Sequence, residues 1–160
     1  MIEMKVNGLA IDSASKMPVV ILTDGEEKRF LPIWIGVYEA DAILVALEDI
    51  KVPRPMTHDL VKNMLETLKA KVDKVVIHDI KNNTFFARIH IIKDGAESEI
   101  DSRPSDAIAL GLRAGASIYV SESVIMEATI MDKSKYEKEM KEFKEFLKGV
   151  KPSDFINYKE

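Results

Sequence analysis

The sequence predicts an α+β fold: a mixed or antiparallel sheet with packed helices, followed by a C-terminal amphipathic helix. Two observations support this prediction. Strand-like apolar runs are joined at tight Asp-Gly turns, at 24–25 and again at 94–95, and each group of strands is followed by one helix. The helical run DAILVAL at 41–47 is also echoed by DAIALGL at 106–112, which indicates an internal duplication of a β-rich unit closed by a helix.

The first half of the chain reads as three strands and two helices. Strands are expected at 4–11, 17–23 and 29–35. Pro32 assigns the third strand to a sheet edge or a bulge, because proline cannot donate a ladder hydrogen bond. Apolar residues recur at helical spacing over 39–49, and Thr57 is a good N-cap for a second helix. The inner face of that helix is expected to consist of Leu60, Val61, Met64, Leu65 and Leu68.

The second half repeats the pattern and adds a tail. Strands are expected at 75–80, at 84–92, in a short segment ending near Asp101, and at 117–120. Ser105 to Arg113 has almost no polar face, so we expect a helix buried nearly all round and ended by Gly115. A short helix is expected at 121–128. The last helix, 135–150, carries an apolar stripe of Tyr136, Met140, Phe143, Leu147 and Val150.

Length and composition limit the class of protein. The 160 residues fit one α+β domain, expected at 1–130, with a helical extension at 131–160. Cysteine is absent, which excludes disulfides and cysteine-bound zinc. No apolar run approaches the roughly 18 residues of a membrane span, so we expect no membrane partner and a cytoplasmic location. The net charge of −4 counts against nucleic-acid binding by bulk charge, and the lack of glutamine leans toward a heat-adapted source.

Polar residues gather in the run IDSRPSD, directly before the buried helix of the second half. In a purely structural interpretation, Pro104 suits the first helical turn, a serine caps the helix, and Arg103 pairs with Asp101 or Asp106. In a functional interpretation, the free N–H groups of the helix start bind a phosphate together with Arg103 and Ser105. Asp101 and Asp106 would then hold a divalent ion. The residues of this run fit both interpretations.

Two other predicted helix starts carry similar residues. Arg54 precedes a proline and the second helix, as Arg103 precedes a proline and the buried helix. His58 lies in the first helical turn, where the helix dipole disfavours its cation, so it is a candidate base or ligand. Glu39 and Asp41 open the first helix, where acids either complement the dipole or bind a metal.

Other familiar chemistry is absent. The sequence contains no phosphate-binding loop, GxGxxG, HExxH or GxSxG motif. A metal site shared by His78 and His90 is rejected, because the predicted hairpin places them on opposite faces.

Five separated segments together resemble the bifunctional nuclease domain family. They are LPIWIGVYEADAI (31–43), RPMTHDL (54–60), VDKVVIHDIKNNTFFARI (72–89), IDSRPSDAIAL (100–110) and ASIYVSESV (116–124). The resemblance runs in order from about residue 4 to residue 128. It implies a compact α+β domain, association into a homodimer, and nuclease activity on RNA and DNA, which some plant relatives carry.

The leading hypothesis is a metal-assisted phosphodiesterase that acts on RNA and DNA. The candidate ligands for Mg²⁺ or Mn²⁺ are Glu39, Asp41, Asp101 and Asp106. The candidate catalytic residues are His58, which would transfer the proton, with Asp59, Asp101 and Asp106. The candidate phosphate-binding residues are Arg54, Arg103 and Ser105. The alternative is a non-enzymatic oligomeric module that binds a protein or an anion. The enzyme requires the three helix starts to meet at one open site, whereas scattered and fully paired acids favour the module.

Overall fold

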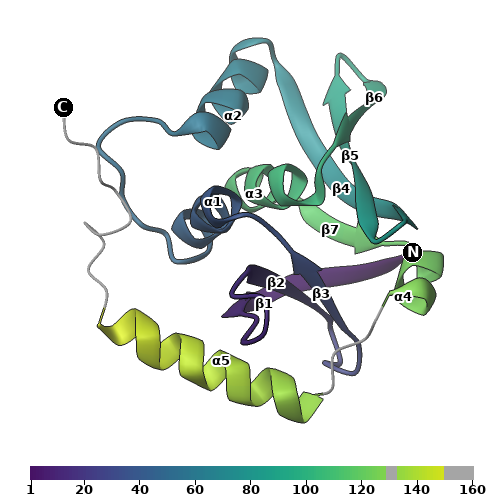
Figure 1. Cartoon of the computed structure of the whole chain (residues 1–160). Helices are drawn as coiled ribbons and strands as arrows, with labels where there is room; N and C mark the ends of the chain where they lie inside the picture. Colours follow the sequence, from purple (N-terminus) through teal and green to yellow (C-terminus); the bar gives the residue numbers. More distant parts are fainter. Residues whose placement is uncertain (129–132, 150–160) are drawn as a thin grey trace.

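The computed structural model describes residues 1–128 and 133–149, in which helices cover a seven-stranded mixed sheet (Figure 1). The strands are β1 (Ile2–Ile11), β2 (Pro18–Asp24), β3 (Phe30–Trp34), β4 (Ala70–Lys81), β5 (Thr84–Lys93), β6 (Ala96–Ser102) and β7 (Ser117–Val120). The helices are α1 (Val37–Leu47), α2 (Thr57–Thr67), α3 (Pro104–Ala114), α4 (Glu122–Glu127) and α5 (Lys133–Lys148). The predicted α+β class with a mixed sheet is confirmed.

The sheet consists of two three-stranded meanders that meet at β7. Its strand order is β3-β2-β1-β7-β4-β5-β6, and all neighbours are antiparallel except β4 and β7. The first meander leads into α1 and the second into α3, and these two helices contact each other. The predicted duplication therefore corresponds to two strand–strand–strand–helix units (Figure 1). Pro32 lies in β3, which is an edge strand, as expected.

Helix α3 is buried nearly all round, as its sequence predicts. The helix ends at Gly115, whose φ of 65° lies in the left-handed region that glycine adopts without strain. The predicted caps are wrong in detail. Arg103 is the N-cap of α3 and makes no side-chain cap, and the N-cap of α2 is Met56, with Thr57 as the first helical residue. Asp59 serves the start of α2 instead, because its carboxylate accepts a 2.9 Å hydrogen bond from the backbone N–H of Met56.

The apolar stripe of α2 faces solvent, which corrects the prediction that it is an inner face. Leu60, Met64 and Leu68 are 53%, 56% and 59% exposed. Leu65 alone is partly buried against the core. The reason is that α2 contacts α3 and β4 along its other side, which carries Asp59 and Leu65.

Helix α5 packs against β1 at Gly8. Met140 is buried there, and a Cβ at position 8 would lie 2.5 Å from its Cε atom. The side chains of Tyr136 and Leu147, and all of Val150, lie outside the described residues. Among the described helices, none is both long and apolar enough to cross a bilayer.

Candidate active site

The starts of α1, α2 and α3 meet at four charged or titratable side chains: Glu39, His58, Arg103 and Asp106, here called the helix-start cluster. Arg103 donates from Nε to Oδ2 of Asp106 at 2.8 Å and from Nη1 to Oε1 of Glu39 at 2.9 Å. Nε2 of His58 lies 2.9 Å from Oδ1 of Asp106. Residues that are distant in the sequence thus form one hydrogen-bonded network, as the enzyme hypothesis requires.

Local sequence explains this convergence. Gly36 is the N-cap of α1, and a Cβ at this position would overlap Oε2 of Glu39. Because glycine has no side chain, the carboxylate can fold over the helix start and reach Arg103. Pro104 at the first position of α3 needs no hydrogen-bond partner for a backbone N–H. The chain can therefore turn from β6 into α3 within one residue, which is Arg103.

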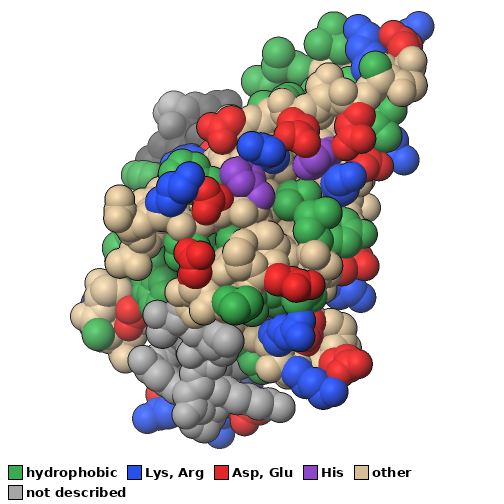
Figure 2. Space-filling view, turned by 90° about the vertical axis from the view of Figure 1, so that its right-hand side faces the viewer, with side chains coloured by type: hydrophobic (Ala, Val, Ile, Leu, Met, Phe, Trp, Pro, Cys, Tyr) green, Lys and Arg blue, Asp and Glu red, His purple; other side chains and the backbone are tan. Residues whose placement is uncertain are grey.

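The helix-start cluster is accessible to solvent but internally paired. The side chains of Arg103 and Asp106 are 63% and 35% exposed, and that of His58 is 16% exposed. Figure 2 shows a face of the molecule on which acidic, basic and histidine side chains lie next to one another. The observed arrangement combines features of both hypotheses, because the groups meet at the surface and yet neutralise one another.

Hydrogen bonding favours the ionised form of the cluster. Burial opposes ionisation of Asp106, but hydrogen bonds from Arg103 and His58 outweigh it and hold the pKa of that carboxyl below its usual value. The pKa of Glu39 is lowered by its own backbone N–H and by Arg103. Asp106 and then Glu39 raise the pKa of Arg103. Two carboxylates thus face one guanidinium, which donates to both of them.

Asp59 and Arg113 form a second ion pair that holds α2 against α3. Nε of Arg113 donates to Oδ1 of Asp59 at 2.8 Å, and Nη1 donates to the carbonyls of Ala42 and Ala109, each at 2.9 Å. Burial opposes ionisation of Asp59, but the Met56 N–H and Arg113 together lower its pKa. Sequence reasoning missed Arg113. The available signal was a single arginine in a helix expected to be buried nearly all round, since a buried charge needs a partner.

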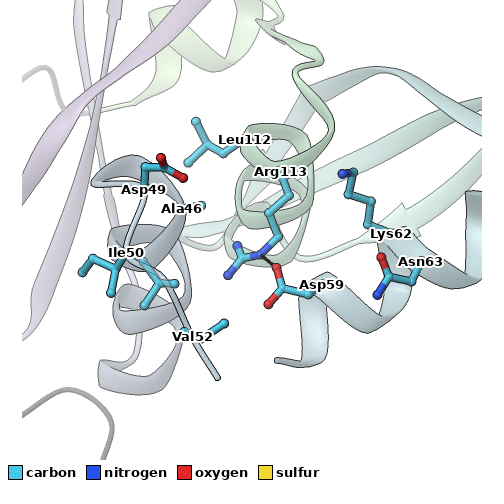
Figure 3. Close-up of a pocket in the computed structure, with 10 residues that line it drawn as sticks. Ala46, Asp49, Ile50, Val52, Asp59, Lys62, Asn63, Leu112 and Arg113 are labelled. Atoms are coloured by element: carbon cyan, nitrogen blue, oxygen red, sulfur yellow. Dashed lines mark hydrogen bonds and ion pairs between the residues drawn. The ribbon is translucent and has the colours of Figure 1, made fainter. Parts of the chain in front are cut away.

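A polar cavity of about 270 Å³ adjoins this ion pair. It lies between the end of α1, the first turns of α2 and the end of α3, as Figure 3 shows. In Figure 3, Arg113 extends from α3 toward Asp59, with Lys62 and Asn63 on the α2 side. Nη2 of Arg113 is buried and has no partner within the described parts of the chain. Asp59 therefore belongs to the wall of this cavity and not to the network around Arg103.

Besides Asp59, four predicted site residues lie outside the helix-start cluster. Asp41 lines a separate cavity with Leu44. It faces away from Glu39, because residues two apart on a helix point in different directions. The side chains of Asp101 and Arg54 are exposed and make no hydrogen bond or ion pair within residues 1–128 and 133–149. Ser105 is buried, with 5% of its surface exposed, so a phosphate could not reach its hydroxyl without displacing neighbours.

The carboxylates do not assemble a ready metal site. Within the described residues, no three His, Asp or Glu side chains lie in an arrangement that could hold a metal ion. Arg103 lies between Glu39 and Asp106 and donates to Oε1 of Glu39 and to both carboxylate oxygens of Asp106. His78 and His90 do not form a joint site either. Nδ1 of His90 lies 2.8 Å from Oε1 of Glu97, whereas Nε2 of His78 is buried without a partner in the described part. The Mg²⁺ or Mn²⁺ requirement stays a prediction.

Comparison with known proteins connects this arrangement to a family. The family model described as the bifunctional nuclease domain matches residues 20–133. An uncharacterized protein of Mycobacterium tuberculosis is 36% identical over 162 residues, which cover 96% of this chain and 97% of the relative. Bifunctional nuclease 1 of Oryza sativa subsp. indica is 30% identical over 116 residues, or 71% of this chain and 35% of the plant protein. Bifunctional nuclease 1 of Arabidopsis thaliana is 26% identical over 114 residues, and the match again covers 35% of the plant protein.

Proposed function

The chain belongs to the bifunctional nuclease domain family, and from this membership we propose that it is a cytoplasmic nuclease that hydrolyses phosphodiester bonds in RNA and DNA. The observation that carries the proposal to a site is the convergence of His58, Asp106, Arg103 and Glu39 from three helix starts. This convergence supports catalysis, because hydrolysis of a phosphodiester needs a proton acceptor beside cationic groups.

In the proposed mechanism, Asp106 orients His58 as the proton acceptor. With the proton on Nε2, the 2.9 Å contact is a hydrogen bond to the carboxylate, and the lone pair of Nδ1 is left free. Nδ1 makes no hydrogen bond within the described residues. Nδ1 of His58 takes a proton from the attacking water while the water oxygen bonds to phosphorus. The ester P–O bond then breaks, the leaving oxygen takes a proton from solvent water, and His58 returns its proton to the solvent.

Arg54 and Arg103 are the proposed phosphate-binding groups. Arg54 is exposed and has no partner in the described part of the chain, so it is free to meet a phosphate. Arg103 must exchange a carboxylate oxygen for a phosphate oxygen, and the negative charges of Glu39 and Asp106 repel the incoming phosphate. A divalent cation would relieve that repulsion. We assign no step to a metal ion, since fewer than three ligands are in place.

The test is cleavage of single-stranded RNA and DNA by the full chain, with and without Mg²⁺ or Mn²⁺ and with a chelator. We expect His58→Gln and Asp106→Asn to lower the cleavage rate by about 10²–10⁴-fold, the usual contribution of general acid–base catalysis. Asp49→Asn, an exposed acid away from the cluster, serves as the control. Full activity in both cluster variants would move the site elsewhere. Intact polymers in every metal condition would remove the nuclease proposal.

A non-enzymatic module that binds an anion or a protein is the second candidate. The observation in its favour is that each member of the helix-start cluster already has a partner of complementary charge or hydrogen bonding. Such a network is sufficient to fix three helices. If the wild-type protein cleaves neither polymer but binds inorganic phosphate, and Arg54→Ala abolishes that binding, the module is the better description.

We also propose that two copies of the chain associate through the apolar stripe of α2. Leu60, Val61, Met64 and Leu68 are all exposed, and a contiguous apolar stripe of this kind is unusual on a monomer surface. Light scattering coupled to size exclusion measures the mass. Met64→Glu is expected to convert a dimer to a monomer, whereas Asn63→Glu, which faces the Arg113 cavity, is not. A wild-type protein that elutes as a monomer would contradict this proposal.

A further inference from the structure

A second cavity lies on the opposite side of α1 from the helix-start cluster and has a different chemistry. Its volume is about 220 Å³, and it lies between α1, the facing ends of β1 and β2, and α5. The walls are almost wholly apolar, formed mainly by Leu9, Ile11, Pro18, Val37, Leu44 and Phe143. Among the described residues that line it, Asp41 is the only acid.

The carboxylate of Asp41 has no partner in the described part of the chain. It makes no hydrogen bond or ion pair within the described residues, unlike Glu39 two positions earlier. Burial is the single cause acting on this carboxyl, and it raises the pKa of Asp41. Lys16 also lines the cavity, but it forms no ion pair with Asp41 and does not lower that pKa. Burial of a carboxylate without a counter-charge costs free energy. A cation with an apolar chain would therefore gain affinity both from an ion pair with Asp41 and from contact with the apolar walls.

We propose that this cavity binds a small alkylammonium ligand, whose ammonium group pairs with Asp41 and whose hydrocarbon chain lies against the apolar walls. A volume of 220 Å³ corresponds to about seven waters, so the ligand has roughly six or seven non-hydrogen atoms. An anion is disfavoured by Asp41, and a bare metal ion would lack the several oxygen ligands it requires. Glu39 and Asp41 point to different sides of α1, so the site is independent of the proposed nuclease site.

The experiment titrates pentylammonium into the full chain at pH 7 and follows binding by NMR chemical shifts of the backbone amides. Pentanol and pentanoate are the matched probes, since they share the chain but replace the ammonium by a neutral or an anionic group. We expect saturable shifts around Asp41 and Leu44 with pentylammonium, at least tenfold weaker binding of pentanol, and none of pentanoate. Absence of saturation with pentylammonium, or equal binding of pentanol, would overturn the proposal.

Two variants test the pocket itself. Asp41→Asn keeps the shape and removes the charge, and is expected to weaken pentylammonium binding at least tenfold while leaving pentanol unchanged. Ala40→Leu fills the cavity and is expected to abolish binding of both probes. Asp49→Asn is the control for a general loss of negative charge. Equal affinity in Asp41→Asn and wild type would assign the binding to another place. Nα-acetyl-lysinamide, which is too large for the cavity, is expected to bind more weakly, and equal binding would reassign the pocket to a lysine side chain of a partner protein.

Discussion

Arg113→Met is expected to destabilise the fold by roughly 3 kcal/mol, because it breaks a buried ion pair while keeping the apolar stem. The Arg113 side chain is 6% exposed and makes three hydrogen bonds, to Asp59 and to two backbone carbonyls. Loss of the hydrogen bond to the charged Asp59 costs about 1.5–3 kcal/mol, and each carbonyl loses about 1 kcal/mol. Removal of Nη2, which is buried without a partner in the described residues, offsets part of this loss of stability, and Asp59, which is 29% exposed, regains some hydration. The estimate therefore lies at the low end of the range for broken buried pairs.

Urea unfolding followed by far-UV circular dichroism measures this loss, which should also lower Tm by roughly 6–12 °C. Arg88→Met is the matched control, because the Arg88–Glu99 pair is about half exposed and worth at most about 1 kcal/mol. A double-mutant cycle with Asp59→Asn should give a coupling of about 1 kcal/mol or more. If Arg113→Met costs no more than Arg88→Met, or if the cycle shows additivity, the ion pair does not hold α2 in place.

Three further predictions follow from particular contacts. Gly36→Ala should displace Glu39 from Arg103 and lower the Tm, whereas Gly25→Ala, where a Cβ meets no atom within 4 Å, should change little; equal melting curves for the two variants would contradict the role of Gly36. Gly8→Ala should push Met140 out of its seat, so limited trypsin digestion is expected to cut at the α5 lysines sooner than in wild type, and an unchanged rate would argue against this contact. The lowered pKa values of Asp59 and Asp106 mean that their stabilisation is complete above about pH 4, the ordinary carboxyl value, and is lost as pH falls through the lower folded-state values; Asp106→Asn should flatten the acid limb of a stability–pH curve, and an unaltered limb would refute the assignment.

The sequence was sufficient for features that depend on local periodicity. The near-absence of polar residues from Ser105 to Arg113 predicts a buried helix. Seven residues of α3 are indeed buried: Pro104, Ser105, Ala107, Ile108, Ala109, Leu110 and Gly111. The duplication was visible because both units end in a helix with a similar sequence. These features require no knowledge of which elements become neighbours.

Features that depend on neighbours were out of reach. The stripe of α2 has helical spacing whether or not another surface covers it, so the pattern gave no way to tell that Leu60 and Met64 face solvent. The pairing of Arg103 with both Glu39 and Asp106 likewise depends on where α1 lies. The separation of Glu39 from Asp41, in contrast, was predictable, because residues i and i+2 of a helix point about 200° apart around its axis.

Placement of the short strand β7 has a consequence for the order in which the molecule assembles. No strand of the first meander pairs with a strand of the second, and only residues 117–120 bond to both. During synthesis, the first meander leaves the ribosome long before this segment does, so it must persist with β1 unpaired on one side. Closing the sheet also brings Met4 against Ile118, a contact between opposite ends of the domain that is intrinsically slow to form. Chains that stop before residue 117 should therefore accumulate as separate meanders with unpaired, aggregation-prone strand edges. Pairing of β7 with both meanders is thus the step that protects the molecule against aggregation.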